Sequence, residues 1–156
     1  GCVRLTPPEG ISPVAFIPDF ELRTAAARAA LPATVPHGDA SFNVARGALL
    51  AAVLSGNAQA GGGADLHALL MEATRDRLHQ EQRRAVMEPS LALVDWLRGA
   101  GFAAVVSGAG PTVLSLESVG ADICRDAAAA GWRVVPMGVA PQGAQITRGS
   151  LSKVEF

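Results

Sequence analysis

Residues 102–116 read FAAVVSGAGPTVLSL, and this stretch decides the fold of the chain. Its two ends, Phe102–Val106 and Thr112–Leu116, are short runs rich in valine and other residues that favour strands. Its middle, Ser107–Pro111, consists of small residues, glycine and proline, which favour a tight connection. The pattern therefore predicts two strands joined by a loop whose backbone no bulky side chain covers.

Helical patterns lie on both sides of this pair of strands. Glu88-Pro89-Ser90 opens a helix, because proline fits the first helical turn, and the glycines at 99 and 101 close it. A second helix runs from about Gly120 to Ala130, followed by a strand over Trp132–Val139 and a weaker one over Ala144–Thr147. The residues that we expect to face the core from the first helix are Leu93, Trp96, Leu97 and Ala100.

The N-terminal part begins with a strand and a short helix. Val14–Ile17 is an apolar run that Pro18 ends, because proline cannot donate to a β-ladder. Thr24 can cap a helix that continues through alanines to Leu31 and stops at Pro32.

Two further helices are expected between residues 36 and 78. Asp39 or Ser41 can cap the first, which ends at Ser55–Asn57, and Asp65 can cap the second, which ends near Leu78. Gly61–Gly63 between them reads as a flexible loop. The apolar residues at helical spacing are Phe42, Ala45, Leu49, Leu50 and Val53 in the first helix and Leu66, Leu69, Leu70 and Ala73 in the second.

Together these segments predict an α+β fold, with helices packed on one face of a small, mainly antiparallel sheet. A chain of 156 residues with 49% apolar residues can bury one full core but is short for two ordinary domains. One compact domain is the expectation.

Composition excludes several classes of protein. The formal net charge of -1 and the lack of a basic run disfavour nucleic-acid binding. The apolar runs are shorter than the roughly 18 residues that a membrane-spanning helix needs. Cys2 and Cys124 form no metal or disulfide pattern, which indicates a reducing, cytoplasmic setting. Because the chain starts at Gly1 without Met or a signal sequence, we expect a truncated chain.

The loop Ser107-Gly108-Ala109-Gly110-Pro111-Thr112 is the first candidate for chemistry. Its backbone N–H groups could form a cradle for an anion, although a plain turn between strands explains the residues equally well. The loop is neither a dinucleotide fingerprint nor a Walker loop, since a third glycine, a following helix and a Lys-Ser or Lys-Thr pair are absent.

SGAGPT between two strands resembles the third signature motif of the GHMP kinases, which include galactokinase, homoserine kinase and mevalonate kinase. Within that family, RTAAARAALP (residues 23–32), PHGDASFNVARGALL (36–50) and DRLHQEQR (76–83) are similar to homoserine kinase segments. In the last of these, Glu81 replaces the usual proline, which puts the local turn in doubt. The resemblance extends from about Val14 to Thr147.

The resemblance implies a ferredoxin-like C-terminal domain over residues 21–148, preceded by the end of an ATP-binding domain (1–20) and followed by a tail (149–156). It implies the conversion of ATP and L-homoserine to ADP and O-phospho-L-homoserine, in threonine biosynthesis. ATP and Mg²⁺ would be held mostly by a preceding half, so that this fragment would contain no catalytic residue and be inactive alone. A homodimer is also expected.

The resemblance suggests Arg28 and Arg83 as the partners of the homoserine carboxylate. A guanidinium fork suits a carboxylate, because it can donate two parallel hydrogen bonds. By their sequence alone, both would be solvated surface arginines. The resemblance places Thr24 near the reacting hydroxyl, whereas by itself Thr24 is as well explained as a helix cap.

The remaining polar residues have simpler interpretations. His37 and Asn43 match the homoserine kinase pattern loosely and are interpreted as a turn histidine and a helix-surface amide. His67 and His79 are interpreted as surface residues, and no metal site or hydrolase triad is evident. Two alternatives stay open: another GHMP small-molecule kinase, and a noncatalytic α+β module that binds an amino acid for regulation.

Overall fold

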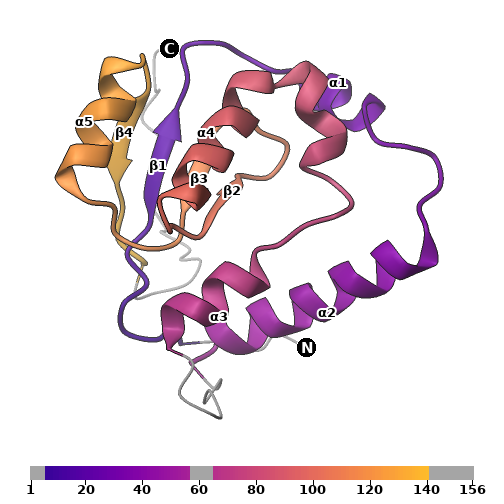
Figure 1. Cartoon of the computed structure of the whole chain (residues 1–156), viewed down its shortest axis with the longest axis horizontal. Helices are drawn as coiled ribbons and strands as arrows, with labels where there is room; N and C mark the ends of the chain where they lie inside the picture. Colours follow the sequence, from indigo (N-terminus) through magenta and orange to yellow (C-terminus); the bar gives the residue numbers. More distant parts are fainter. Residues whose placement is uncertain (1–5, 57–64, 141–156) are drawn as a thin grey trace, which may run out of the picture.

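The computed structural model describes residues 6–56 and 65–140, and in them four strands form one sheet (Figure 1). The strands are β1 (Val14–Ile17), β2 (Ala104–Val106), β3 (Val113–Ser115) and β4 (Arg133–Pro136). Their order is β2-β3-β1-β4, and each neighbouring pair is antiparallel. The expected antiparallel sheet is confirmed, β1 has the expected bounds, and the other three strands are shorter than the apolar runs suggested.

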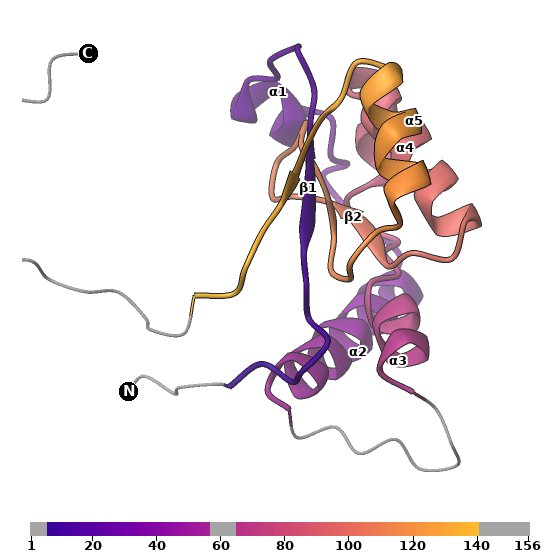
Figure 2. The same cartoon turned by 90° about the vertical axis from the view of Figure 1, so that its left-hand side faces the viewer.

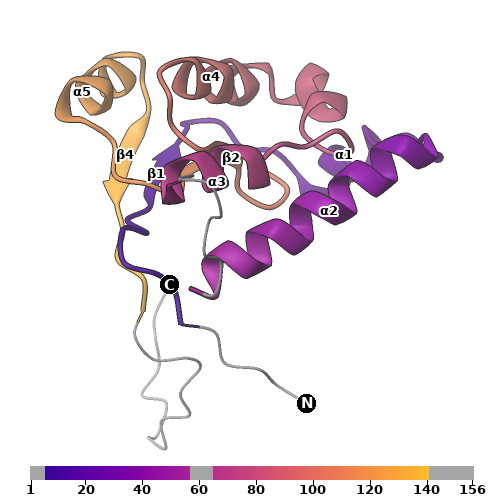
Figure 3. The same cartoon turned by 60° about the horizontal axis from the view of Figure 1, so that its bottom comes forward.

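The helices form two groups. α4 (Glu88–Gly99) and α5 (Ala121–Ala129) cover one face of the sheet, as Figure 2 shows. α2 (His37–Leu54) and α3 (Leu66–Ala73) pack on each other at one end of the domain, where α3 lies against the C-terminal part of α2 (Figure 3). The shorter α1 (Thr24–Ala29) and the 3₁₀ helix η2 (Glu81–Val86) complete the described part. The α+β arrangement of helices on one sheet face is confirmed.

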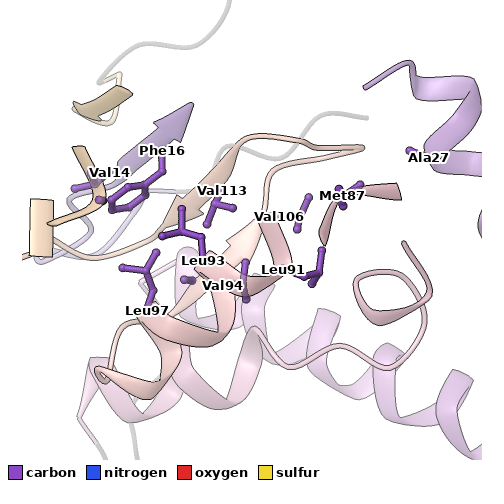
Figure 4. Close-up of a cluster of buried hydrophobic side chains, with 12 residues drawn as sticks. Val14, Phe16, Ala27, Met87, Leu91, Leu93, Val94, Leu97, Val106 and Val113 are labelled. Atoms are coloured by element: carbon purple, nitrogen blue, oxygen red, sulfur yellow. The ribbon is translucent and has the colours of Figure 1, made fainter. Parts of the chain in front are cut away.

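The main core lies between the sheet and α4. Phe16 and Val113 of the strands and Leu93 and Leu97 of α4 are buried in one cluster (Figure 4). A second cluster, around Val53, Leu70 and Ala103, joins α2 and α3 to the end of the sheet.

The expected inward face of α4 is partly wrong. Leu93 and Leu97 are buried, but Trp96 is 40% exposed and Ala100 is exposed. The buried stripe centres on Leu91, Val94 and Leu97, which recur every three residues, and Trp96 lies beside that stripe. Ala100 follows the last helical residue, Gly99, and therefore presents no helical face.

Two expected helix caps are also wrong. α1 begins at Thr24, as expected, but the capping position is Arg23 and no side-chain hydrogen bond caps the helix. α2 begins at His37, so Asp39 and Ser41 lie inside its first turns and not before them. A negative charge in the first turn, here Asp39, still interacts favourably with the free N–H groups of the helix.

The other helix ends follow the sequence more closely. Asp65 caps α3 as expected, since its carboxylate accepts a hydrogen bond from the N–H of Ala68 at 2.8 Å. α3 ends at Ala73 and not near Leu78, because the next residues turn around the carboxylate of Asp76. Gly56 and Gly101, with φ of +71° and +90°, follow α2 and α4 at the expected stops.

Some expectations stay untested. The loop over 61–63 and the strand over 144–147 lie outside the described residues. The proposed domain division at residue 20 stays a prediction, although β1 is an interior strand that pairs with both β3 and β4. No helix in residues 6–56 and 65–140 is long and apolar enough to cross a membrane.

Candidate functional site

The glycine loop, residues 107–112, is a closed turn between β2 and β3. The N–H of Ser107 donates to the carbonyl of Thr112 at 2.8 Å, and the N–H of Gly110 donates to the carbonyl of Ser107 at 3.0 Å. Gly108 and Gly110 have φ of +59° and +84°, a region that favours glycine. These two bonds leave the N–H groups of Gly108 and Ala109 for other partners, which is what an anion cradle requires.

The segment formed by η2 and α4 holds this loop from one side. Arg83 donates from Nη1 to the carbonyl of Gly108 at 3.2 Å, and Ser90 donates from Oγ to the carbonyl of Pro111 at 2.6 Å. The α-carbon of Gly110 lies so close to Met87 that a Cβ would be 2.9 Å from the methionine Cε. Three contacts therefore fix the loop in one place.

Arg83 also connects the loop to α1. Its Nε donates to the carbonyl of Ala27 at 3.2 Å, and the residue is only 8% exposed. The interpretation of Arg83 as a solvated surface arginine is therefore wrong. One guanidinium brings together three segments that resemble GHMP kinases, residues 23–32, 76–83 and 107–112.

Thr24 and Arg28 lie one helical turn apart on the exposed side of α1, whereas Ala27 between them is fully buried. Residues spaced by four share one face of a helix, so the hydroxyl and the guanidinium lie on the same side. Arg28 immediately follows the residue whose carbonyl Arg83 holds. The roles of Thr24, Arg28 and Arg83 toward a substrate stay predictions.

Asp76 organises the turn after α3. Its carboxylate accepts hydrogen bonds from the backbone N–H groups of Leu78, His79 and Gln80, from the amide of Asn43 and from the His79 ring. Burial by itself would raise the pKa of Asp76, but these hydrogen bonds, with those from Gln80 and Asn43 foremost, outweigh it and lower the pKa to about 2. The carboxylate is therefore ionised and fully engaged in holding the turn.

Asn43 is not the plain helix-surface amide that the sequence suggested. It donates to Asp76, and its Oδ1 accepts the N–H of Arg77 at 2.9 Å, so it joins α2 to the turn. Gln80 joins the same turn to the sheet, because its Oε1 accepts the N–H of Val106 at 2.8 Å. No sequence signal distinguished Gln80, which lies inside the DRLHQEQR segment.

The three histidines have ordinary surroundings. His37 is exposed at the start of α2, and its ring lies 3.5 Å from the hydroxyl of Ser41. The His67 ring lies 2.9 Å from the Glu117 carboxylate, and His79 contacts Asp76. In the described ranges, no three His, Cys, Asp or Glu side chains gather closely enough to hold a metal ion.

Two cavities border the glycine loop at different residues. One, of about 400 Å³, lies between α2, the Asp76 turn and β2, and both Arg83 and Gly108 line it. The other, of about 440 Å³, is lined by residues 17–23 together with Pro111 and Thr112. Different residues of the loop thus line each cavity.

Comparison with known proteins identifies this arrangement. The family model described as "GHMP kinases C terminal" matches residues 49–131, which include α4, the glycine loop and α5. The chain belongs to the GHMP kinase family. Residues 49–131 match the C-terminal part of these kinases, and the glycine loop lies within this matched region.

Two of the similar curated relatives are homoserine kinases. The chain is 42% identical over 145 residues to the homoserine kinase of Streptomyces coelicolor, which covers 92% of this chain and 44% of the relative. It is 45% identical over 134 residues to the homoserine kinase of Corynebacterium efficiens, covering 85% of this chain and 40% of the relative. The chain therefore spans less than half the length of these GHMP kinases.

A solved structure supports the fold. The homoserine kinase from Cytophaga hutchinsonii matches with a TM-score of 0.67 at 20% identity, over 88% of this chain and 44% of that one. At this identity the likeness shows the fold, which is the α+β domain expected for a GHMP kinase.

Proposed function

We propose that this chain is the substrate-orienting part of a homoserine kinase, which transfers the γ-phosphoryl group of ATP to the side-chain hydroxyl of L-homoserine. The reaction would serve threonine biosynthesis in the cytoplasm. The observation that carries the proposal is the 42% identity to homoserine kinases over 92% of the chain. The proposal is also supported by the contacts of Arg83, which join the three segments that resemble GHMP kinases.

The proposed role of this half is to recognise and place the amino acid. Arg28 and Arg83 are the proposed partners of the α-carboxylate, because a guanidinium can donate two hydrogen bonds to it. Thr24, on the same side of α1 as Arg28, is proposed to lie near the reacting hydroxyl. Phosphoryl transfer depends mainly on positioning and on electrostatic stabilisation, so a domain that holds one reactant can contribute strongly to the rate.

ATP and Mg²⁺ are proposed as the cosubstrate and metal of the complete protein. When bound, the Mg²⁺ ion neutralises charge on the phosphates. The acidic groups near the glycine loop do not fit a metal site, since Asp76 is saturated by hydrogen bonds and Glu81 pairs with Arg84. We therefore assign no described residue to the metal, and propose that its ligands belong to the other half of the protein. A homodimer is proposed for the complete protein as well.

The test is the substrate preference of the complete protein. With ATP and Mg²⁺, L-homoserine should be phosphorylated with a higher kcat/KM than galactose or mevalonate, as measured by coupled ADP release. Mass spectrometry should identify O-phospho-L-homoserine. A higher kcat/KM for galactose or mevalonate would assign the chain to another GHMP kinase, and binding of homoserine without turnover would favour a regulatory module.

A further inference from the structure

We propose that Ser90 is a positioning residue for the phosphoryl transfer, because its hydroxyl holds the glycine loop in the orientation that presents its N–H groups to an anion. This inference rests on the proposed function. Ser90 lies in the first turn of α4 and outside the segments that resemble homoserine kinases most closely.

The burial of Ser90 is unusual for a serine. It is fully buried, with apolar neighbours in the chain such as Leu91 and Met87 that are also buried. A buried hydroxyl is costly unless it is hydrogen-bonded. Its Oγ lies 2.6 Å from the carbonyl oxygen of Pro111, which is 21 residues further along the chain. The hydroxyl therefore connects α4 to the glycine loop.

This bond, together with that from Arg83, sets the direction of the loop's peptide groups. The carbonyls of Gly108 and Pro111 both point toward the η2–α4 segment, where Arg83 and Ser90 bind them. The peptide bonds that follow Gly108 and Pro111 are trans, and in a trans peptide the N–H points opposite to the C=O. The N–H groups of Ala109 and Thr112 therefore point away from α4.

One of these two residues borders a cavity that a ligand can reach. Ala109 and Thr112 are half-buried, and Thr112 lines the cavity of about 440 Å³ beside the segment that leads into α1. Oriented backbone N–H groups attract anions, and both the carboxylate and the phosphoryl group of the proposed reaction are anionic.

Loss of the Ser90 hydroxyl should reorient the loop without unfolding the domain. The carbonyl of Pro111 would lose its donor and turn toward water, and the attached N–H of Thr112 would turn with it. Arg83 would still hold Gly108, and Met87 would still pack beside Gly110. The expected defect is thus in alignment of the reactants.

Ser115 provides a matched control. It is also fully buried, and its Oγ also donates to a backbone carbonyl, that of Glu117 at 2.9 Å, while it accepts the N–H of Glu117 at 3.3 Å. It lies at the end of β3 away from the glycine loop. Ser90→Ala and Ser115→Ala therefore both remove a hydroxyl that donates to a backbone carbonyl from equally buried positions, and Ser115→Ala removes one accepted bond in addition.

The experiment compares both variants in the complete protein. Ser90→Ala should lower kcat by about 10- to 100-fold for the substrate that accepts the phosphoryl group, because the reactants are misplaced. The KM for ATP should change less than about twofold. Ser115→Ala should keep kcat near wild type while lowering the melting temperature by a similar amount. Ser90→Thr, which keeps the hydroxyl, should recover most of the lost kcat.

Hydrogen exchange gives a readout independent of turnover. The exchange rate of the Thr112 N–H should change in Ser90→Ala but not in Ser115→Ala, whereas that of Ala109, whose peptide Arg83 still holds, should change less. Equal exchange in both variants, or an equal loss of kcat, would overturn the proposal. Failure of wild type to phosphorylate homoserine would instead count against the proposed function, and the same comparison would then use the substrate that is turned over.

Discussion

Arg28 and Arg83 carry the same charged group but occupy opposite environments. Arg83 is buried and donates to two backbone carbonyls, whereas Arg28 is exposed on α1. A buried guanidinium without an acidic partner is tolerated when backbone oxygens satisfy it, as they do here and at Arg98, which donates to the carbonyls of Met71 and Ala104. At the residue scale, Arg28 can offer its whole fork to a ligand, whereas Arg83, which lines the cavity of about 400 Å³, already gives two of its N–H groups to backbone carbonyls.

We predict that Arg28→Ala in the complete protein raises the KM for homoserine by about 30-fold or more, equivalent to at least ~2 kcal/mol of binding, because the substrate carboxylate loses its partner. The KM for ATP should change little. Arg28→Lys should restore only part of the affinity, since lysine keeps the charge but not the fork. Steady-state kinetics at varied homoserine check this, and unchanged homoserine KM in Arg28→Ala would rule out the assignment.

Asp76 makes stability depend on pH. Its pKa falls from 3.8 in the unfolded chain to about 2 in the folded one, so the folded state is favoured where the carboxylate is ionised. This contribution, about 2 kcal/mol, is complete well above pH 4 and is lost as the pH falls toward about 2. We predict that Asp76→Asn lowers the free energy of unfolding at pH 7 by about that amount and by much less near pH 2.

Urea unfolding at several pH values measures this difference. Asp39→Asn is the control, because Asp39 is paired only at 3.4 Å with Arg77 at the surface, and such pairs contribute little. A constant difference between Asp76→Asn and wild type across pH would show that the carboxylate's charge is not what stabilises the turn.

At the scale of elements, the glycine loop and the η2–α4 segment behave as one unit. Met87 fills the space beside Gly110, Arg83 holds Gly108, and Ser90 holds Pro111. All three side chains come from residues 83–90, so the position of one short segment fixes the position of the loop. The loop's conformation is therefore decided by packing as much as by its own glycines.

Gly110→Ala tests that packing. The added Cβ would lie 2.9 Å from Cε and 3.0 Å from Sδ of Met87, which is fully buried, and the φ of +84° is strained for alanine. We predict a loss of about 2–4 kcal/mol in the free energy of unfolding. Gly108→Ala, with a φ of +59° but open space around the new Cβ, should lose only about 1 kcal/mol. Equal losses of stability for Gly110→Ala and Gly108→Ala in thermal or urea unfolding would mean that the Met87 side chain can move aside at little cost.

At the scale of the whole molecule, the described residues form a sheet covered by helices, and the relatives of this chain are longer than the chain itself. Arg98 and the Asp76 turn join the α2–α3 layer to the sheet, because their partners lie in α3, α2 and β2. The curated relatives are more than twice as long as this chain.

We predict that residues 1–156 alone release no ADP in the presence of ATP and homoserine, whereas the complete protein does. Catalysis of phosphoryl transfer requires both reactants to be aligned in one site, and the proposed ATP-binding half is separate from these residues. A coupled ADP assay on both proteins at equal concentration is the measurement. Turnover by the 156-residue chain would show that it binds ATP by itself.

The sequence by itself determined the fold class and the family. Alternating strand and helix patterns, with glycine and proline at the turns, are local properties, and they correctly indicated a small antiparallel sheet with helices on one face. The glycine loop and the three flanking segments carried the resemblance, which the family match confirms. The predicted capping residues of α1 and α2 were wrong, because Thr24, Asp39 and Ser41 are all residue types that often cap helices and only the observed geometry excludes them as caps.

Only the tertiary structure decided which polar side chains are buried and what they hold. In the sequence, Arg83 and Asn43 resemble surface residues. Their partners are far along the chain: Arg83 binds carbonyls 25 and 56 residues away, and Asn43 binds a carboxylate 33 residues away. Ser90 gave no signal at all, because a serine in a first helical turn is ordinary and its partner, the Pro111 carbonyl, is a backbone atom that every residue possesses. Contacts between a side chain and a distant backbone leave no pattern in a single sequence, and they are what fixes the glycine loop.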